Sequence, residues 1–304
     1  MTILLLGANG QIGSSLRSRL AALGKVIAGT REDIDLSNHD LLLKKIKMYK
    51  PQIVVNAAAY TSVNQAEEKQ EEVFSINVGA VQCIAEWAKE NQSLFIHYSS
   101  DYVFDGKNPK PYVETDQANP LSVYGKSKMA GEQAIALSGC LHLIYRTSWV
   151  YNNNGRNFAE KILHLAGQRD TLKIIGDVSG TPTHADLIAD VTIYCLRLYM
   201  NSPEDEKEKL SGLYHLTAGG STSWYGFAMY LIVGAIRGGA TLACAQESII
   251  SVLNSEYNEG AARPINSILS CEKIKQTFGV NLPVWEVYAD KFLKEWIAGR
   301  VNAA

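Results

Sequence analysis

The sequence predicts an α/β protein built on a doubly wound parallel sheet. Three observations lead to this fold class. Short apolar runs alternate with segments of helical periodicity through the first half of the chain, as expected for parallel strands joined by crossover helices. A glycine-rich turn follows the first apolar run. With 304 residues, the chain is also long enough for this sheet and a smaller second domain.

Five apolar runs are predicted to be strands, because each is short and bounded by turn residues. They are Ile3–Leu6, Val26–Ala28, Ile53–Val55, Leu94–Tyr98 and Leu141–Tyr145. The segments between them have helical periodicity. Helices are predicted over 12–23, over 41–48 with Ser37 as a cap, over 63–91, and from Ser122 onward. Right-handed crossovers should bring the carboxyl ends of the strands to one edge, where ligands bind.

The second half of the chain is less regular and predicts a smaller, C-terminal α/β domain. We place the boundary so that the domains cover 1–150 and 151–304, with the helix over 185–200 packing back on the first. The other predicted features of this half are a loop at 152–155, a solvated charged connection at 202–209, a strand at 214–216, a loop at 260–264 and helices over 224–236, 271–278 and 283–297.

Composition excludes several classes of function. The 29 basic and 31 acidic residues give a net charge of −2 without a basic stripe, so nucleic-acid binding is not expected. The 5 cysteines are scattered without a C-x-x-C pair, and the 6 histidines form no metal-binding pattern. We therefore expect reduced thiols and no metal site. Neither a signal peptide nor a membrane span is evident, which predicts a cytoplasmic protein.

The turn after the first strand carries Gly7, Gly10 and Gly13 and opens a helix. This is the context of the dinucleotide fingerprint, in which glycines let the backbone approach a pyrophosphate at a helix N-terminus. The turn therefore predicts a Rossmann-like domain. Its spacing differs from the usual G-x-G-x-x-G, and a glycine turn that serves only packing is the alternative.

The end of the second predicted strand bears on the choice of cofactor. Thr30 and Arg31 stand where an acid would hold the ribose 2′-hydroxyl of NAD. A hydroxyl and a guanidinium suit a 2′-phosphate, so NADPH is favoured over NADH, unless Arg31 is only a solvated surface charge. Small or strand-end residues that could flank adenine or ribose, or simply pack tightly, follow at Asp35, Leu36, Ala57, Ala58 and Ala59.

Tyr124 and Lys128 lie four residues apart and so share one face of a predicted helix. An ammonium beside a phenol lowers its pKa toward the working range, which suits proton transfer to a carbon-bound oxygen. Ser100, at a predicted strand end, could hydrogen-bond the same oxygen. With 15 tyrosines in the chain, one such pair is expected by chance, and Ser100 could be an ordinary cap. The glycine turn upstream favours the catalytic interpretation.

These patterns together resemble the extended short-chain dehydrogenase/reductase family over nearly the whole chain. The segments that carry the resemblance are 7–13 (GANGQIG), 56–61 (NAAAYT), 99–106 (SSDYVFDG), 119–128 (NPLSVYGKSK), 146–151 (RTSWVY) and 263–267 (RPINS). The resemblance implies Tyr124 as the proton donor with Lys128 as its partner. It also implies further contacts, made to the cofactor by Gln11, Ile12, Tyr60, Tyr124 and Lys128, and to the substrate by Ser100, Asp101, Tyr102, Trp149 and Arg263.

The activity implied by this resemblance is NADPH-dependent reduction of the C4 keto group of a dTDP-linked 4-keto-6-deoxy sugar. A sister reductase that makes a 6-deoxy-L-talose nucleotide and a non-catalytic NADP-binding regulatory subunit remain alternatives. A homodimer is compatible with the family. Some relatives bridge their dimer with magnesium through a glutamate in the first helix, where this chain has Ser15, so the metal bridge is doubtful.

Overall fold

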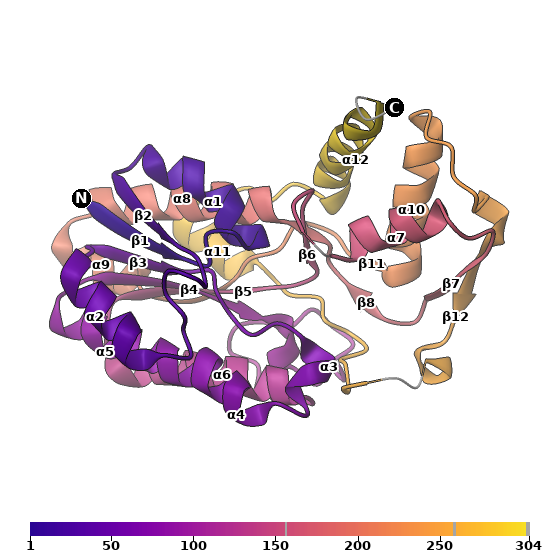
Figure 1. Ribbon diagram of the computed structural model, residues 1–304. Coiled ribbons are helices and arrows are strands. Elements are labelled where there is room, and N and C mark those ends of the chain that lie inside the picture. The colour runs from indigo at the N-terminus through magenta and orange to yellow at the C-terminus, as the bar shows by residue number, and fades with distance from the viewer. Residues whose placement is uncertain (156, 258–259, 302–304) are drawn as a thin grey trace.

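The computed structural model describes residues 1–155, 157–257 and 260–301 (Figure 1). Its central sheet has six strands, all parallel, in the order β10-β5-β4-β3-β1-β2. Their bounds are β1 Thr2–Leu6, β2 Lys25–Gly29, β3 Ile53–Asn56, β4 Leu94–Ser100, β5 His142–Thr147 and β10 Gly212–His215. The predicted α/β class with a doubly wound parallel sheet is confirmed.

Helices cover both faces of this sheet (Figure 1). One face carries α1 (Gln11–Ala21), α8 (Ala185–Asn201) and α11 (Glu272–Phe278), and the other carries α2 (His39–Tyr49), α5 (Ala80–Glu90) and α6 (Val123–Ser138). Because successive strand residues point to opposite faces, Leu5 packs into the first core while Leu4 and Leu6 pack into the second. Both cores are therefore anchored in the same strand.

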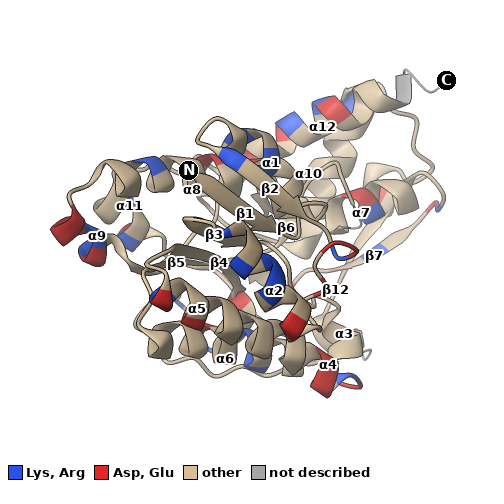
Figure 2. Cartoon of the chain, turned by 60° about the vertical axis from the view of Figure 1, so that its left-hand side comes forward, with Lys and Arg blue, Asp and Glu red and all other residues tan. Residues whose placement is uncertain are grey.

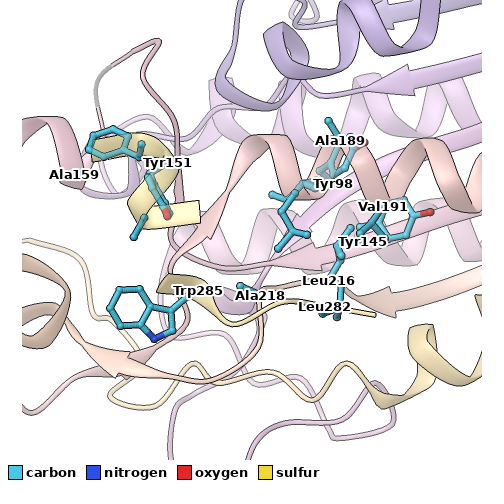
Figure 3. Close-up of a cluster of buried hydrophobic side chains, with 14 of the residues drawn as sticks. Tyr98, Tyr145, Tyr151, Ala159, Ala189, Val191, Leu216, Ala218, Leu282 and Trp285 are labelled. Carbon is cyan, nitrogen blue, oxygen red and sulfur yellow. The ribbon is translucent and has the colours of Figure 1, made fainter. Parts of the chain in front are cut away.

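Beyond the sheet lie three two-stranded pairs and three helices, drawn on the right of Figure 1. The pairs are β6 (Val150–Tyr151) with β9 (Thr183–His184), β7 (Leu172–Ile175) with β12 (Ile249–Val252), and β8 (Ser179–Gly180) with β11 (Thr222–Ser223). The helices are α7 (Phe158–Ala166), α10 (Trp224–Arg237) and α12 (Trp285–Val301). One continuous core joins this region to the sheet (Figure 3). It contains Tyr98 and Tyr145 of the sheet together with Tyr151 and Trp285. The domain boundary near residue 150 stays a prediction.

Three predicted elements differ from the structure. The helix expected over 63–91 is divided into α3 (Val63–Ala66), α4 (Gln70–Phe74), the π turn η1 (Ser75–Gly79) and α5. The first interruption is at Lys69, whose φ of −113° and ψ of 41° are not helical, and nearby the Glu67 carboxylate accepts a hydrogen bond from Val123 N at 2.9 Å. Sequence periodicity within the segment cannot report a contact 56 residues away.

The cap of α2 is Asn38 rather than Ser37. The Asn38 side chain accepts from Leu41 N at 3.0 Å, while Ser37 N donates to Asp35 in the preceding turn. The charged segment 202–209 is not an irregular loop, because most of it belongs to the helix α9 (Glu204–Leu210). Acidic residues in the first turn of α9 and lysines in its last turn suit the helix dipole.

Charged residues of both signs alternate along outward-facing helices, as the blue and red segments of α9 and α12 in Figure 2 show. Within the described residues, no helix has the length and apolarity that crossing a bilayer requires. The five cysteines are free thiols, and four of them are buried. No group of three metal-binding side chains occurs in the described part of the chain.

Candidate active site

The glycine turn lies between β1 and α1, at the carboxyl edge of the sheet. Gly7 has φ +73°, and a Cβ there would lie 2.7 Å from Ala58 N, so only glycine fits. A Cβ at Gly13 would collide with the carbonyl oxygen of Gly7. Gly10 caps α1 and no acidic residue occupies the first turn of this helix. The turn is therefore a compact cradle whose free N–H groups can bind an anion.

An acid that the sequence analysis overlooked follows β2. The Asp33 carboxylate accepts hydrogen bonds from Thr30 N at 3.0 Å and from Thr30 Oγ1 at 2.8 Å, and these bonds lower its pKa. Thr30 is therefore engaged within its own turn. The side chain of Arg31 is 74% exposed and its closest carboxylate is Glu72, at 3.6 Å. Arg31 thus remains accessible to an incoming anion.

The next two predicted cofactor segments lie beside this turn. Asp35 accepts from Ser37 N at 3.0 Å, and Leu36 is buried in the core below β2. After β3, the backbone of Ala57 and Ala58 packs against Gly7, as the close approach at that glycine requires. Tyr60 N donates to Asn77 Oδ1 at 2.8 Å, which holds the β3 loop against η1. The structure therefore brings these predicted residues to one edge.

Ser100 is the last residue of β4 and is 6% exposed. Its hydroxyl donates to Asp101 Oδ1 at 2.9 Å and accepts from Tyr102 N at 3.2 Å. The Ser100 hydroxyl also acts on the Tyr124 phenol and lowers the pKa of that phenol. Desolvation outweighs this contribution and raises the pKa of Tyr124, which is half-buried. The two predicted catalytic hydroxyls therefore lie close together at one site.

Tyr124 and Lys128 lie on α6, which begins where Ser122 accepts a hydrogen bond from Gly125 N. Lys128 is 1% exposed, and its Nζ donates to the Tyr98 carbonyl oxygen at 2.7 Å. Burial lowers the pKa of Lys128 to about 8. The amine is thus directed toward β4 here, and its action on the Tyr124 pKa stays a prediction.

Residues that were predicted to contact the substrate line part of one pocket. Tyr102, Trp149, Trp224 and Arg263 contribute to its wall. Trp149 has φ +46° and stacks on Trp224, with ring centroids 3.5 Å apart and planes 10° apart. Arg263 Nη2 donates to Asn64 Oδ1 at 3.3 Å, which orients the guanidinium at the rim. Three of these residues were predicted, whereas Trp224 was not.

Comparison with known proteins agrees with this geometry. The model of the RmlD substrate binding domain family matches residues 1–297. The chain belongs to this family. A dTDP-4-dehydrorhamnose reductase of Salmonella typhimurium is 42% identical over 299 residues, covering 97% of this chain and 98% of the relative. A relative of the same name from Escherichia coli K12 is also 42% identical over 299 residues.

Solved structures also resemble this RmlD-family chain over nearly its whole length. A dTDP-4-dehydrorhamnose reductase of Clostridium acetobutylicum superposes with a TM-score of 0.87 at 30% identity, covering 97% of this chain and 99% of that one. The enzyme of the same name from Bacillus anthracis, solved in complex with NADP, has a TM-score of 0.86 at 27% identity, covering 97% and 99%. Their fold is the Rossmann-like α/β fold described above.

Several buried polar residues of this family member were missed in the sequence. Asn77, in the π turn, donates to the Tyr60 carbonyl at 3.1 Å and to Ser127 Oγ at 2.9 Å, so it ties the β3 loop to α6. His97 contacts Lys128 and Asn56. The hint in the sequence was an isolated asparagine or histidine within an apolar run. Such a residue does not reveal which other residue it hydrogen-bonds. Trp224, directly after the capping Ser223, gave no signal beyond its residue type.

Proposed function

We propose that this chain is a reductase that uses NADPH to convert dTDP-4-dehydro-6-deoxy-L-mannose into dTDP-L-rhamnose. The observation that carries the proposal is the meeting of Ser100 and Tyr124 at the carboxyl edge of β4, with Lys128 one helical turn beyond. The close-fitting glycine cradle at Gly7 and Gly13 suits a dinucleotide pyrophosphate. The cofactor would supply a hydride to C4 of the sugar.

Two residues of the chain protonate and orient the oxygen at C4. As the C4–O double bond opens, Tyr124 gives its phenolic proton to that oxygen, and Ser100 donates a hydrogen bond that orients it. The high pKa of the half-buried phenol keeps Tyr124 protonated at neutral pH, as an acid must be before it acts. Lys128 is proposed to stabilise the resulting phenolate as a cation.

The remaining pocket residues are proposed to bind the nucleotide sugar. The guanidinium of Arg263 has the fork geometry that suits the oxygens of a diphosphate. Tyr102, Trp149 and Asp101 would contact the sugar. Asp101 is 2% exposed, and burial raises its pKa to about 7. A carboxyl with such a pKa can donate or accept a hydrogen bond to a sugar hydroxyl near neutral pH.

Replacement of Tyr124 tests this mechanism. Tyr124→Phe removes the proton donor and keeps the ring, so NADPH oxidation with the keto sugar should fall by roughly 10²–10⁴-fold. NADPH affinity, measured by fluorescence titration, should stay within about twofold because the lost hydroxyl is not a phosphate contact.

Tyr194→Phe is the matched control, because this α8 tyrosine is 47% exposed and lies outside the site. Undiminished turnover by Tyr124→Phe would overturn the proposed mechanism. NMR of the product would report the configuration at C4 and so separate the rhamnose from the talose nucleotide. Turnover by the wild-type chain also separates the enzyme from a regulatory subunit.

A homodimer stays a prediction, and we propose that no metal bridges it. Ser15 is 9% exposed and hydrogen-bonds Asp186 of α8, which contributes to lowering the pKa of that carboxyl. A serine carries no charge to hold magnesium, which prefers carboxylate ligands. Sedimentation velocity should therefore give the same coefficient with and without EDTA, and a shift on chelation would contradict the proposal.

A further inference from the structure

A polar cluster lies under the active site, between the sheet and α6. Asn56 and His97 are directly opposite each other on the paired strands β3 and β4. Lys128 reaches them from α6. Each of the three residues is only 1% exposed. Since buried polar groups need defined hydrogen-bond partners, the direction of every bond in this cluster can be assigned.

The first bond in the cluster determines the histidine tautomer. Ala58 N–H donates to Asn56 Oδ1 at 3.1 Å, so the amide nitrogen of Asn56 faces His97 Nδ1 at 3.3 Å. An amide nitrogen only donates, and His97 Nδ1 must therefore accept and carry no hydrogen. Burial lowers the pKa of His97 well below its usual value, which keeps the ring neutral. Its hydrogen is then on Nε2.

The second bond constrains Lys128. His97 Nε2 lies 3.2 Å from Lys128 Nζ, which also lies 2.7 Å from the Tyr98 carbonyl oxygen. An ammonium has three donors and no lone pair, so it cannot accept from the Nε2–H group. A neutral amine accepts through its lone pair and still donates to the carbonyl. The geometry is thus satisfied only by the uncharged amine.

We propose that Asn56 and His97 are positioning residues that hold the uncharged form of the Lys128 amine turned toward β4 in the free protein and so ease the loss of its proton. The relay runs from the Asn56 amide to His97, from His97 to Lys128, and from Lys128 to the Tyr98 carbonyl. This inference deepens the proposed function, because Lys128 must gain a proton and leave His97 before it can stabilise the Tyr124 phenolate. The protonation of Lys128 is thereby coupled to the formation of the Tyr124 phenolate.

Other charged groups near Lys128 are consistent with this assignment. Glu132, one turn further along α6, raises the pKa of Lys128, but it is paired with Arg146 of β5 through bonds of 2.9 and 2.6 Å. Burial outweighs it and lowers the pKa of Lys128 to about 8. On the catalytic side, Asp101 of η2 (Asp101–Val103) acts on the pKa of Tyr124. The uncharged amine therefore becomes the main form of Lys128 above about pH 8, well below the usual range for a lysine.

NMR of the free, full-length protein tests the relay directly. Ring ¹⁵N spectra should show His97 with its hydrogen on Nε2, and the Lys128 side-chain signal, identified by its absence in Lys128→Met, should titrate near pH 8. A wild-type His97 with its hydrogen on Nδ1, or a Lys128 that remains an ammonium up to the usual lysine pKa, would overturn the proposal. Neither measurement uses substrate or cofactor, so its outcome is independent of whether the proposed reaction occurs.

Asn56→Asp is the most direct variant. One carboxylate oxygen still accepts from Ala58 N, while the other replaces the N–H donor that faced His97 with an acceptor. The ring should switch to the Nδ1–H tautomer, and Lys128 should bind its proton at least about tenfold more tightly. Asn77→Asp is the matched control, since it places a carboxylate at another buried amide beside α6. It should leave the His97 tautomer unchanged. An unaltered tautomer in folded Asn56→Asp would also contradict the relay.

Discussion

Asp101 illustrates at the residue scale how burial changes the chemistry of a single group. Its ordinary pKa of 3.8 is raised to about 7, first by burial, while hydrogen bonds from Ser100 and Ser267 oppose the rise. The folded state therefore binds the proton more tightly than the unfolded state. The stabilising contribution of the protonated form is complete below pH 3.8 and is lost as the pH rises to about 7.

The variant Asp101→Asn should remove this pH dependence. Wild type loses stability as the pH rises and the variant does not. The free energy of unfolding of the variant minus that of wild type should therefore increase by about 1–3 kcal/mol between about pH 4 and about pH 8. Denaturant unfolding at several pH values measures the difference. Asp205→Asn, at an exposed position of α9, should show no such trend. A constant difference between Asp101→Asn and wild type would refute the assignment.

Arg31 governs the predicted cofactor preference. Its guanidinium is exposed and only weakly paired with Glu72, so little must be broken before it binds a 2′-phosphate. Arg31→Gln should raise the KM for NADPH by roughly tenfold, as expected for the loss of one charge-assisted hydrogen bond. The KM for NADH should be nearly unchanged, because NADH lacks that phosphate. Arg237→Gln, on the exposed end of α10, is the control.

At the residue scale, the sequence located Ser100 and Tyr124 within the fold, because a strand end and a helix start can be read from neighbouring residues. Their catalytic roles stay predictions. Asn56 and His97 could not be paired in advance, because their contact depends on the register of β3 against β4. The same limit applied to Asn77, whose partners belong to a loop and to a helix far along the chain.

At the scale of elements, the start of α6 is supported from outside the helix. Ser122 caps it locally, and Glu67 accepts from Val123 N across the site. Near this contact the segment 63–91 is interrupted at Lys69, whose backbone angles are not helical. Periodicity predicted the helical content of the segment correctly, but it does not report a break at a single residue.

Loss of the Glu67 contact should weaken the start of α6. Glu67→Ala should lower the free energy of unfolding by about 0.5–1 kcal/mol, the usual size of a carboxylate interaction at a helix N-terminus. Thermal unfolding followed by circular dichroism measures this loss. Glu68→Ala is the natural control, because Glu68 is exposed and adjacent. Equal losses in both variants would show that the hydrogen bond to Val123 contributes nothing.

At the scale of the whole molecule, the parallel sheet and its two layers of helices followed from sequence, because strands that alternate with crossover helices leave few arrangements. The position of β10 did not follow. Its four residues look like a minor strand, yet they pair with β5 from Leu143 to Arg146 and complete the sheet. Long-range pairing of so short a segment leaves no local pattern.

The position of β10 has a consequence for how the chain is made. Synthesis proceeds from the N-terminus, so β1 to β5 are complete while the strand that covers the edge of β5 is still more than 60 residues away. α8, which packs on α1, also emerges late. Until then, the nascent sheet presents an unpaired edge and an apolar face, both of which favour aggregation. The newly made protein is therefore expected to depend most on chaperones in this interval.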